Sequence, residues 1–216
     1  NVVNSESAND SLIINSLLNT IKLGFLGAML IVTIALFLAF SKRLFKSSLS
    51  LILNIAKIGY AAPGIVIAIG IIIPVIFIDK KISMIFQYFN FDVGLLISSS
   101  MIILLLAYIV RFFSVAYNPI EAAYEKISKK IDFVSANLGA SNKRLFFNIH
   151  IPMLLMGIVI AYLLVFIDIL KELPATLILR PFNFHTLSII TFEYASSEQL
   201  FMAAKPALLI TLLATL

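Results

Sequence analysis

The stretch DFVSANLGASNKRLFFNIHIP, residues 132–152, decides how this chain is interpreted, because it separates two long apolar segments. Gly139 is suited to end one helix, since glycine accepts the left-handed conformation that follows many helix C-termini. Ser141 is suited to cap the next helix. Pro152 stands near the start of the following apolar segment, where its missing N–H costs least. The spacing predicts a helix–turn–helix between two membrane spans.

Apolar residues recur at helical spacing on both sides of Gly139, at positions 127, 131, 134 and 138 before it and at 145, 146 and 149 after it. This is the stripe of an amphipathic helix. We interpret residues 118–150 as a segment exposed to the cytoplasm, with His150 as one of its surface residues. From the pattern alone, an ordinary amphipathic loop lying on the membrane surface stays equally open.

The composition indicates an integral membrane protein, because 61% of the residues are hydrophobic and only 12% are charged. Soluble domains are about 45–50% apolar and about 25% charged. The apolar runs are too long for β-barrel strands, which alternate over about ten residues. Helices satisfy their own backbone polar groups in lipid. The predicted fold is therefore an all-α membrane bundle of about five spans, forming a single transmembrane domain over residues 1–216.

A spanning helix needs roughly 20 apolar residues. The candidates are 17–40, 51–78, 93–110 with a possible extension to 117, 152–170, and a fifth from about 201. The first is followed by Lys42-Arg43 and the second by a loop that starts at Asp79-Lys80-Lys81. The third contains Ser98-Ser99-Ser100. Residues 174–197 are predicted to form an irregular turn and a short helix, because Pro174 and Pro181 interrupt them.

Basic residues predict the orientation, since loops on the cytoplasmic side carry an excess of Lys and Arg. The loops at 41–57 and 111–144 are the richer ones and are placed inside. They carry Lys42, Arg43, Lys46, Lys57, Arg111, Lys126, Lys129, Lys130, Lys143 and Arg144. The net charge of +5 follows from this topology, so it does not indicate a nucleic-acid partner.

Catalytic and cofactor chemistry is not indicated anywhere in the sequence. Cysteine is absent, which removes thiolate metal sites and cysteine nucleophiles. His150 and His185 are isolated, and no Gly-x4-Gly-Lys-[Ser/Thr] phosphate loop occurs. We expect no cofactor in this chain and no enzymatic activity.

The spacing around Gly139 resembles the loop of ABC importer permeases that carries Glu-Ala-Ala, three residues, Gly, nine residues and Ile-x-Leu-Pro. Gly139, Ile149, Ile151 and Pro152 match in register, whereas Phe133-Val134-Ser135 stands where the family has Glu-Ala-Ala. Glu121-Ala122-Ala123 has the same letters but lacks the glycine. The resemblance implies a coupling helix that docks on an ATP-binding subunit dimer, so ATP hydrolysis is expected only on that separate subunit. Its expected contact residues are Ser135, Ala136, Asn137, Gly139, Ala140 and Ser141.

Two further stretches resemble the iron(III)-type permeases of ABC importers, namely ELPATLILRPF at 172–182, followed by Thr186-Leu187, and YAAPG at 60–64. The resemblance implies ferric iron as cargo, alternating access, a multi-pass protein of the bacterial inner membrane, and an external (periplasmic) substrate-binding protein. Two such halves are commonly fused in that family. Because the chain begins at Asn1 and stops inside an apolar run, we expect it to be a piece of a longer polypeptide. The stretch at 172–187 resembles the second half of those permeases, so we expect this piece to be that half, facing the other permease half.

Interrupted helices line substrate paths in transporters. The candidate path or gate residues are Pro63, Gly64, Glu172, Pro174, Thr176 and Arg180. A simple packing kink at Pro63-Gly64 is the alternative.

Asp168 and Glu172 invite a metal-path hypothesis, because a hard trivalent cation favours oxygen ligands. No metal site is assigned, since a local Asp168–Lys171 pair at a helix end and a Glu172–Arg180 pair explain the same charges.

Two other functions stay open from the sequence. The first keeps the permease mechanism and changes the cargo to thiamine, a polyamine or an oxyanion. The second is a membrane scaffold or enzyme subunit without transport activity, in which 118–150 only anchors a partner.

Overall fold

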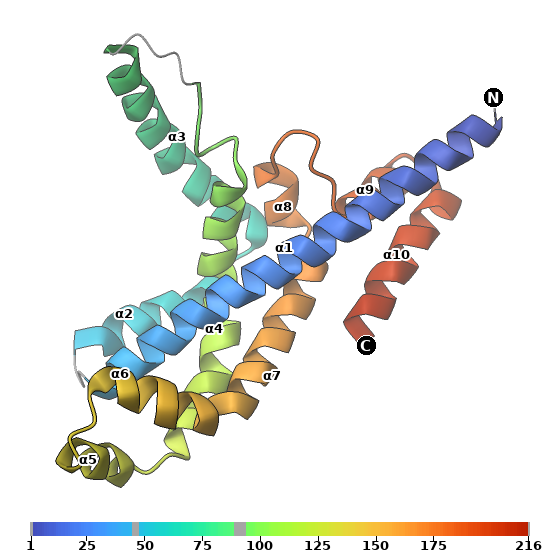
Figure 1. The fold of residues 1–216 in the computed structure, drawn as a ribbon. Coiled ribbons are helices and arrows are strands. Elements are labelled where there is room, and N and C mark those ends of the chain that lie inside the picture. Colours follow the sequence, from blue (N-terminus) through green and yellow to red (C-terminus); the bar gives the residue numbers. More distant parts are fainter. Residues whose placement is uncertain (1, 45–47, 89–93, 216) are drawn as a thin grey trace.

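The structure is a computed structural model that describes residues 2–44, 48–88 and 94–215, with side chains from residue 10 in the first range and from residue 50 in the second (Figure 1). Every regular element in these ranges is helical. The prediction of an all-α membrane protein is confirmed. Three of the described helices are long and apolar enough to cross a membrane, or four if one bent pair counts as a single span.

The centre of the fold is a bundle of α1 (Val2–Leu44), α4 (Met101–Glu125) and α7 (Ile151–Leu170), which pack against one another. Small residues line the contact, because they let helix backbones approach closely inside a membrane. Ala35 of α1, Ala107 of α4 and Ala161 of α7 are fully buried. This bundle confirms the first and fourth predicted spans.

The second predicted span is broken, so a straight helix over 51–78 is wrong. The chain forms α2 (Ser48–Lys57), the short helix η1 (Ile58–Ala61) and α3 (Gly64–Tyr88), with a bend of 120° at the break. Pro63 causes the break, because a residue before proline is driven out of the helical region. Ala62 has the extended angles φ −77° and ψ 138°. The helix α3 then runs through Asp79-Lys80-Lys81, which is therefore no loop.

The third span starts later and ends later than predicted, and the described part of 93–110 is irregular as far as Ser100. Ser100 caps α4 by accepting the N–H of Ile102 at 3.2 Å. Asp79 is 1% exposed and accepts the N–H groups of Ile97 and Ser98 and the Ser98 hydroxyl. The carboxylate thus holds Ile97 and Ser98 in a turn that precedes α4. The possible extension of this span to 117 is confirmed, and residues 118–125, predicted as loop, are helical as well.

The C-terminal part contains α8 (Pro174–Leu179), α9 (Leu187–Ser196) and α10 (Leu200–Thr215). The short helices and the turn between them confirm the prediction for 174–197. In Figure 1, α9 and α10 lie beside the N-terminal half of α1, and the N–H of Leu187 donates to the Thr20 hydroxyl at 2.9 Å. The described part of the fifth predicted span has 16 residues, fewer than a crossing needs by length.

The 132–152 stretch lies at the other end of α1 (Figure 1). It begins within α5 (Lys129–Asn137) and continues through α6 (Asn142–Arg144) and the π-helical η2 (Leu145–His150), which runs directly into α7. The resulting continuous helix spans Asn142–Leu170. The predicted helix–turn–helix is therefore confirmed, and its second helix is the beginning of a membrane span.

Candidate functional site

The turn between α5 and α6 has the geometry that the sequence predicts. Gly139 has φ +75°, and the N–H of Ala140 donates to the carbonyl of Ser135 at 2.9 Å. The N–H of Gly139 donates to the carbonyl of Ala136 at 3.0 Å. This pair of bonds is the Schellman motif, which satisfies the last carbonyls of a helix. Ser141 then accepts the N–H of Arg144 at 3.4 Å and caps the next helix.

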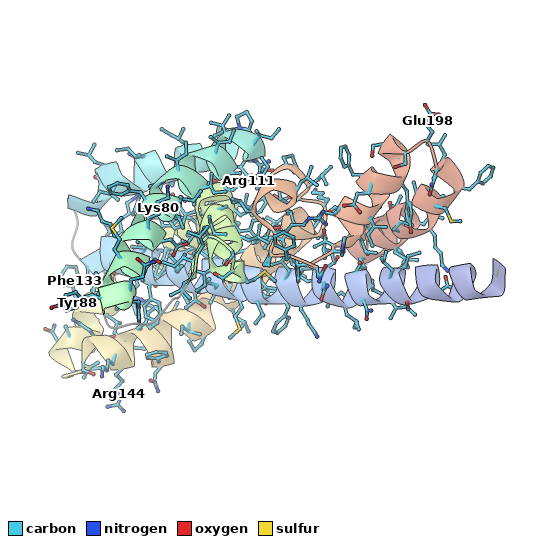
Figure 2. All side chains as sticks on the ribbon, turned by 90° about the horizontal axis from the view of Figure 1, so that it is seen from above. Lys80, Tyr88, Arg111, Phe133, Arg144 and Glu198 are labelled. Carbon is cyan, nitrogen blue, oxygen red and sulfur yellow. The ribbon has the colours of Figure 1, made fainter. Side chains whose placement is uncertain are left out.

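The predicted apolar stripe before Gly139 is partly buried against the bundle and partly exposed. Ile127 of the stripe is 6% exposed, whereas Val134 and Leu138 are 56% and 82% exposed. Phe133, which is not part of the predicted stripe, is 67% exposed beside them. Figure 2 shows Phe133 at the end of the molecule that also carries Arg144. Exposed apolar groups that lie together mark a contact with another protein or with the membrane surface. Ser135 faces inward and is buried, while Ala136, Asn137, Gly139 and Ser141 are exposed and Ala140 is partly exposed.

The inner side of α5 meets the bundle through charged groups. Asp132 accepts Arg43 Nε at 2.6 Å and faces His150 Nε2 at 3.0 Å. His150 is 0% exposed, so its interpretation as a surface residue is wrong. Burial alone would raise the pKa of Asp132, but the hydrogen bonds from Arg43 and His150 outweigh it and hold the pKa below its ordinary value.

Replacing Gly139 by valine is expected to destabilise the turn by about 1–2 kcal/mol, because side chains with a Cβ are strained in the left-handed conformation. A Cβ there would meet nothing within 4 Å, so the cost is conformational. Asparagine tolerates this conformation and serves as the matched control. Thermal unfolding of the purified protein measures the difference; equal melting temperatures for the two variants would contradict the assignment of this turn.

A second cluster of polar residues surrounds the break in the second span. Arg111 donates from Nε to Glu172 Oε2 at 3.0 Å and from Nη1 to the carbonyl of Ala62 at 2.8 Å. Arg111 was predicted to lie in the 111–144 loop. It lies instead inside α4, in the middle of the molecule in Figure 2, so that assignment is wrong. The guanidinium satisfies a carbonyl that the break leaves without a helical partner, as backbone at membrane depth requires.

Four of the candidate path residues meet at this cluster. A Cβ on Gly64 would lie 2.7 Å from Glu172 Oε1 and 3.2 Å from the Pro174 Cβ. Glu172 Oε1 also accepts the N–H of Ala175 at 3.1 Å. The Thr176 hydroxyl donates to the carbonyl of Glu172 at 2.9 Å. Pro63 directly precedes Gly64 at the break. Five of the six candidate path residues therefore lie close together.

The chain is similar in sequence to a known membrane transport protein. No protein family model matches the chain. Over 209 residues the chain is 29% identical to the Fe(3+)-transport system permease protein FbpB 2 of Haemophilus influenzae, covering 96% of this chain and 38% of that protein. The chain is homologous to an iron(III)-transport permease. The resemblance that the sequence motifs indicate is thereby confirmed, and the protein is a multi-pass membrane protein. The chain spans well under half the length of the permease that it matches.

Not every candidate residue of this permease homologue belongs to the cluster. Arg180 contacts His185 Nδ1 at 3.0 Å and Glu193 Oε1 at 2.9 Å, so the alternative of a Glu172–Arg180 pair is wrong. Asp168 pairs with Lys171 at 3.2 Å, as the simpler interpretation predicted. Within the described ranges, no three His, Asp or Glu side chains are grouped to hold a metal ion.

Local sequence patterns do not indicate two of these ion pairs. Arg43 and Asp132 are 89 residues apart, and Arg111 and Glu172 are 61 apart. The one available signal was a charge inside an apolar segment, which marks a functional candidate by default. Arg111 carries this signal. Because it stands at the edge of the third predicted span, it was assigned to the following loop.

Proposed function

We propose that this chain is part of the transmembrane permease subunit of an ATP-driven importer in the bacterial inner membrane, which moves ferric iron by alternating access. The observation that carries the proposal is the exposed apolar face of Phe133, Val134 and Leu138 on a short helix at one end of the spans. The homologous protein is described as an Fe(3+)-transport permease, which supports the cargo.

The expected partners follow from the two ends of the bundle. At the α5 end, the exposed apolar face fits a groove on an ATP-binding subunit dimer, and the basic residues near it place this end in the cytoplasm. Lys46 is one of these basic residues but lies outside the described ones. An external substrate-binding protein faces the opposite end, and the other permease half completes the pore. Residues 118–150 then serve as the coupling segment.

The break at Pro63-Gly64 is the proposed gate. It bends one span by 120° and lies against Glu172, Pro174 and Thr176. Broken helices with paired charges at membrane depth are typical of substrate paths. Closure of the ATP-binding subunits would push α5 and shift the break relative to 172–176. In this proposal Arg180 stands apart from the gate.

Uptake of radiolabelled iron into vesicles that contain the intact complex tests the proposed function. We expect ATP-dependent accumulation of ferric iron that requires the binding protein and that thiamine, polyamines and oxyanions do not suppress. Suppression by one of these competitors would assign the cargo to that class. Absence of ATP-dependent uptake of every cargo would support a scaffold instead.

Replacing Phe133 by glutamine is expected to weaken binding of the ATP-binding subunit by about 30-fold in Kd, because a large aromatic residue at the centre of an interface contributes roughly 2 kcal/mol. The control is Lys130→Gln, an exposed charged residue of the same helix, which we expect to leave the affinity nearly unchanged. Affinity is measured with the purified permease in lipid nanodiscs. Equal affinities for both variants would contradict docking through this face.

A further inference from the structure

The last turn of α1 contains a guanidinium whose donor nitrogens all have partners. Arg43 Nε donates to Asp132 Oδ2 at 2.6 Å, and Nη2 donates to Oδ1 at 3.2 Å. The two contacts form the parallel fork that arginine makes with a carboxylate, which fixes geometry as well as charge. The side chain of Arg43 is 8% exposed. This fork joins a spanning helix to α5.

The same guanidinium holds the turn between α4 and α5. Nη1 donates to the carbonyls of Tyr124 and Ile127, and Nη2 donates to those of Ile127 and Ser128, each at 3.1 Å. These carbonyls lie in the last turn of α4 and in the turn that follows it, where regular helical bonding ends. Those of Tyr124 and Ser128 also accept the backbone N–H groups of Ile127 and Ile131. One side chain therefore fixes the exit of α4, the turn and the carboxylate of α5 together.

A third spanning helix joins through the other face of Asp132. His150, which lies directly before α7, places Nε2 at 3.0 Å from Asp132 Oδ1 and Nδ1 at 3.4 Å from the Tyr124 hydroxyl. With a carboxylate facing Nε2, that nitrogen carries the proton and donates. The ring of Phe40 lies edge-on to His150 at 5.5 Å. The joint formed by Arg43, Asp132 and His150 thus unites α1, α5 and the start of α7.

We propose that Arg43 is the positioning residue that makes the coupling segment move as one body with α1 and α7. The inference rests on the proposed function, because it names how the docked helix is connected to the spans. Figure 1 shows α5 at the edge of the molecule, where its outer face is open. Without the joint, a push on α5 would bend the flanking turns at 126–128 and 138–141 before it moved a span. The contact between Arg43 and Asp132 converts a push on α5 into movement of α1 and α7.

Lysine cannot replace this arrangement, since an ammonium is a compact point charge without the planar fork. Arg43→Lys in the intact reconstituted complex is expected to retain assembly and ATP hydrolysis but to lower the cargo moved per ATP at least about fivefold, the size of a typical coupling energy. Asp132→Asn, which keeps the shape and removes the charge, is expected to act in the same direction. It also tests the joint if Arg43→Lys fails to assemble.

The matched control is Lys42→Met, one residue away in the same helical turn. Lys42 pairs with Glu121 at 2.7 Å, and Glu121 also pairs with Lys57 at 2.5 Å. These pairs connect α1, α4 and α2, and neither of them involves a residue of α5. We expect Lys42→Met to leave the cargo moved per ATP unchanged, whatever it does to the melting temperature. A wild-type ratio in Arg43→Lys and Asp132→Asn, or an equal fall in Lys42→Met, would overturn the proposal. Loss of uptake in the unmodified complex would instead contradict the proposed function.

Discussion

Replacing Gly59 by alanine is expected to lower the stability of the protein by about 3 kcal/mol or more, the upper range for forcing extra atoms into packed structure. A Cβ at this position would lie 2.1 Å from the backbone carbonyl oxygen of Val110. A backbone atom of α4 cannot move aside as a flexible side chain can. The η1 helix would therefore be pushed away from α4, and with it the Ala62 carbonyl that Arg111 holds.

Gly70 provides the matched control, because it lies in α3 of the same broken span and a Cβ there would meet nothing within 4 Å. Gly70→Ala is expected to be neutral or to stabilise by up to about 1 kcal/mol, since alanine is the better helix former. The two substitutions add the same methyl group and should have opposite effects on the melting temperature of the detergent-purified protein. Similar melting temperatures would contradict the close contact of η1 with α4.

Removing the carboxylate of Glu172 is the second change with a large expected effect. Glu172→Ala leaves the Arg111 guanidinium without its counter-charge, and breaking a buried pair in this way costs about 3–5 kcal/mol. The side chain of Glu172 is 6% exposed and that of Arg111 is 18% exposed, so little water is available to compensate. We expect a lower melting temperature and loss of iron uptake.

The double variant Arg111→Met with Glu172→Met separates structure from transport. It removes both charges and is expected to regain part of the stability, because apolar residues of similar volume often replace a buried pair without loss. Uptake should stay absent if Glu172 belongs to the gate. Recovery of uptake along with stability would show that the pair only supports the break. Glu193→Gln, which removes a 43% exposed partner of Arg180, should change neither quantity greatly.

Elements whose cause is local could be predicted from the sequence. The apolar runs of α1 and α7 indicate spans by length alone, because a helix in lipid must satisfy its own backbone. Gly139 and Ser141 indicate the turn between α5 and α6, since each acts through its own backbone preference. The short, interrupted region at 174–197 likewise follows from its prolines. The Asp168–Lys171 pair lies within one helical turn and was predicted on that ground.

Errors arose where a contact with a distant residue changes the meaning of a local pattern. Ser98-Ser99-Ser100 looks like part of a span until Asp79, 19 residues before Ser98, binds the turn. His150 looks like a surface residue because nothing near it in the sequence accepts its proton. Arg111 looks like the first basic residue of a loop, although its partners are Ala62 and Glu172. Pro63 indicates a break in the helix from the sequence alone. The angle of the bend depends on the packing of η1 against α4.

The sequence by itself determined that this protein is helical, that it lies in the membrane, and that a helix–turn–helix with an apolar face stands between two of its spans. These properties depend on composition and on residues a few positions apart. Only the tertiary structure decided which charges meet. The Arg43–Asp132 and Arg111–Glu172 pairs join positions far apart in the chain, and a buried charge is stable only where folding brings its partner within hydrogen-bonding distance.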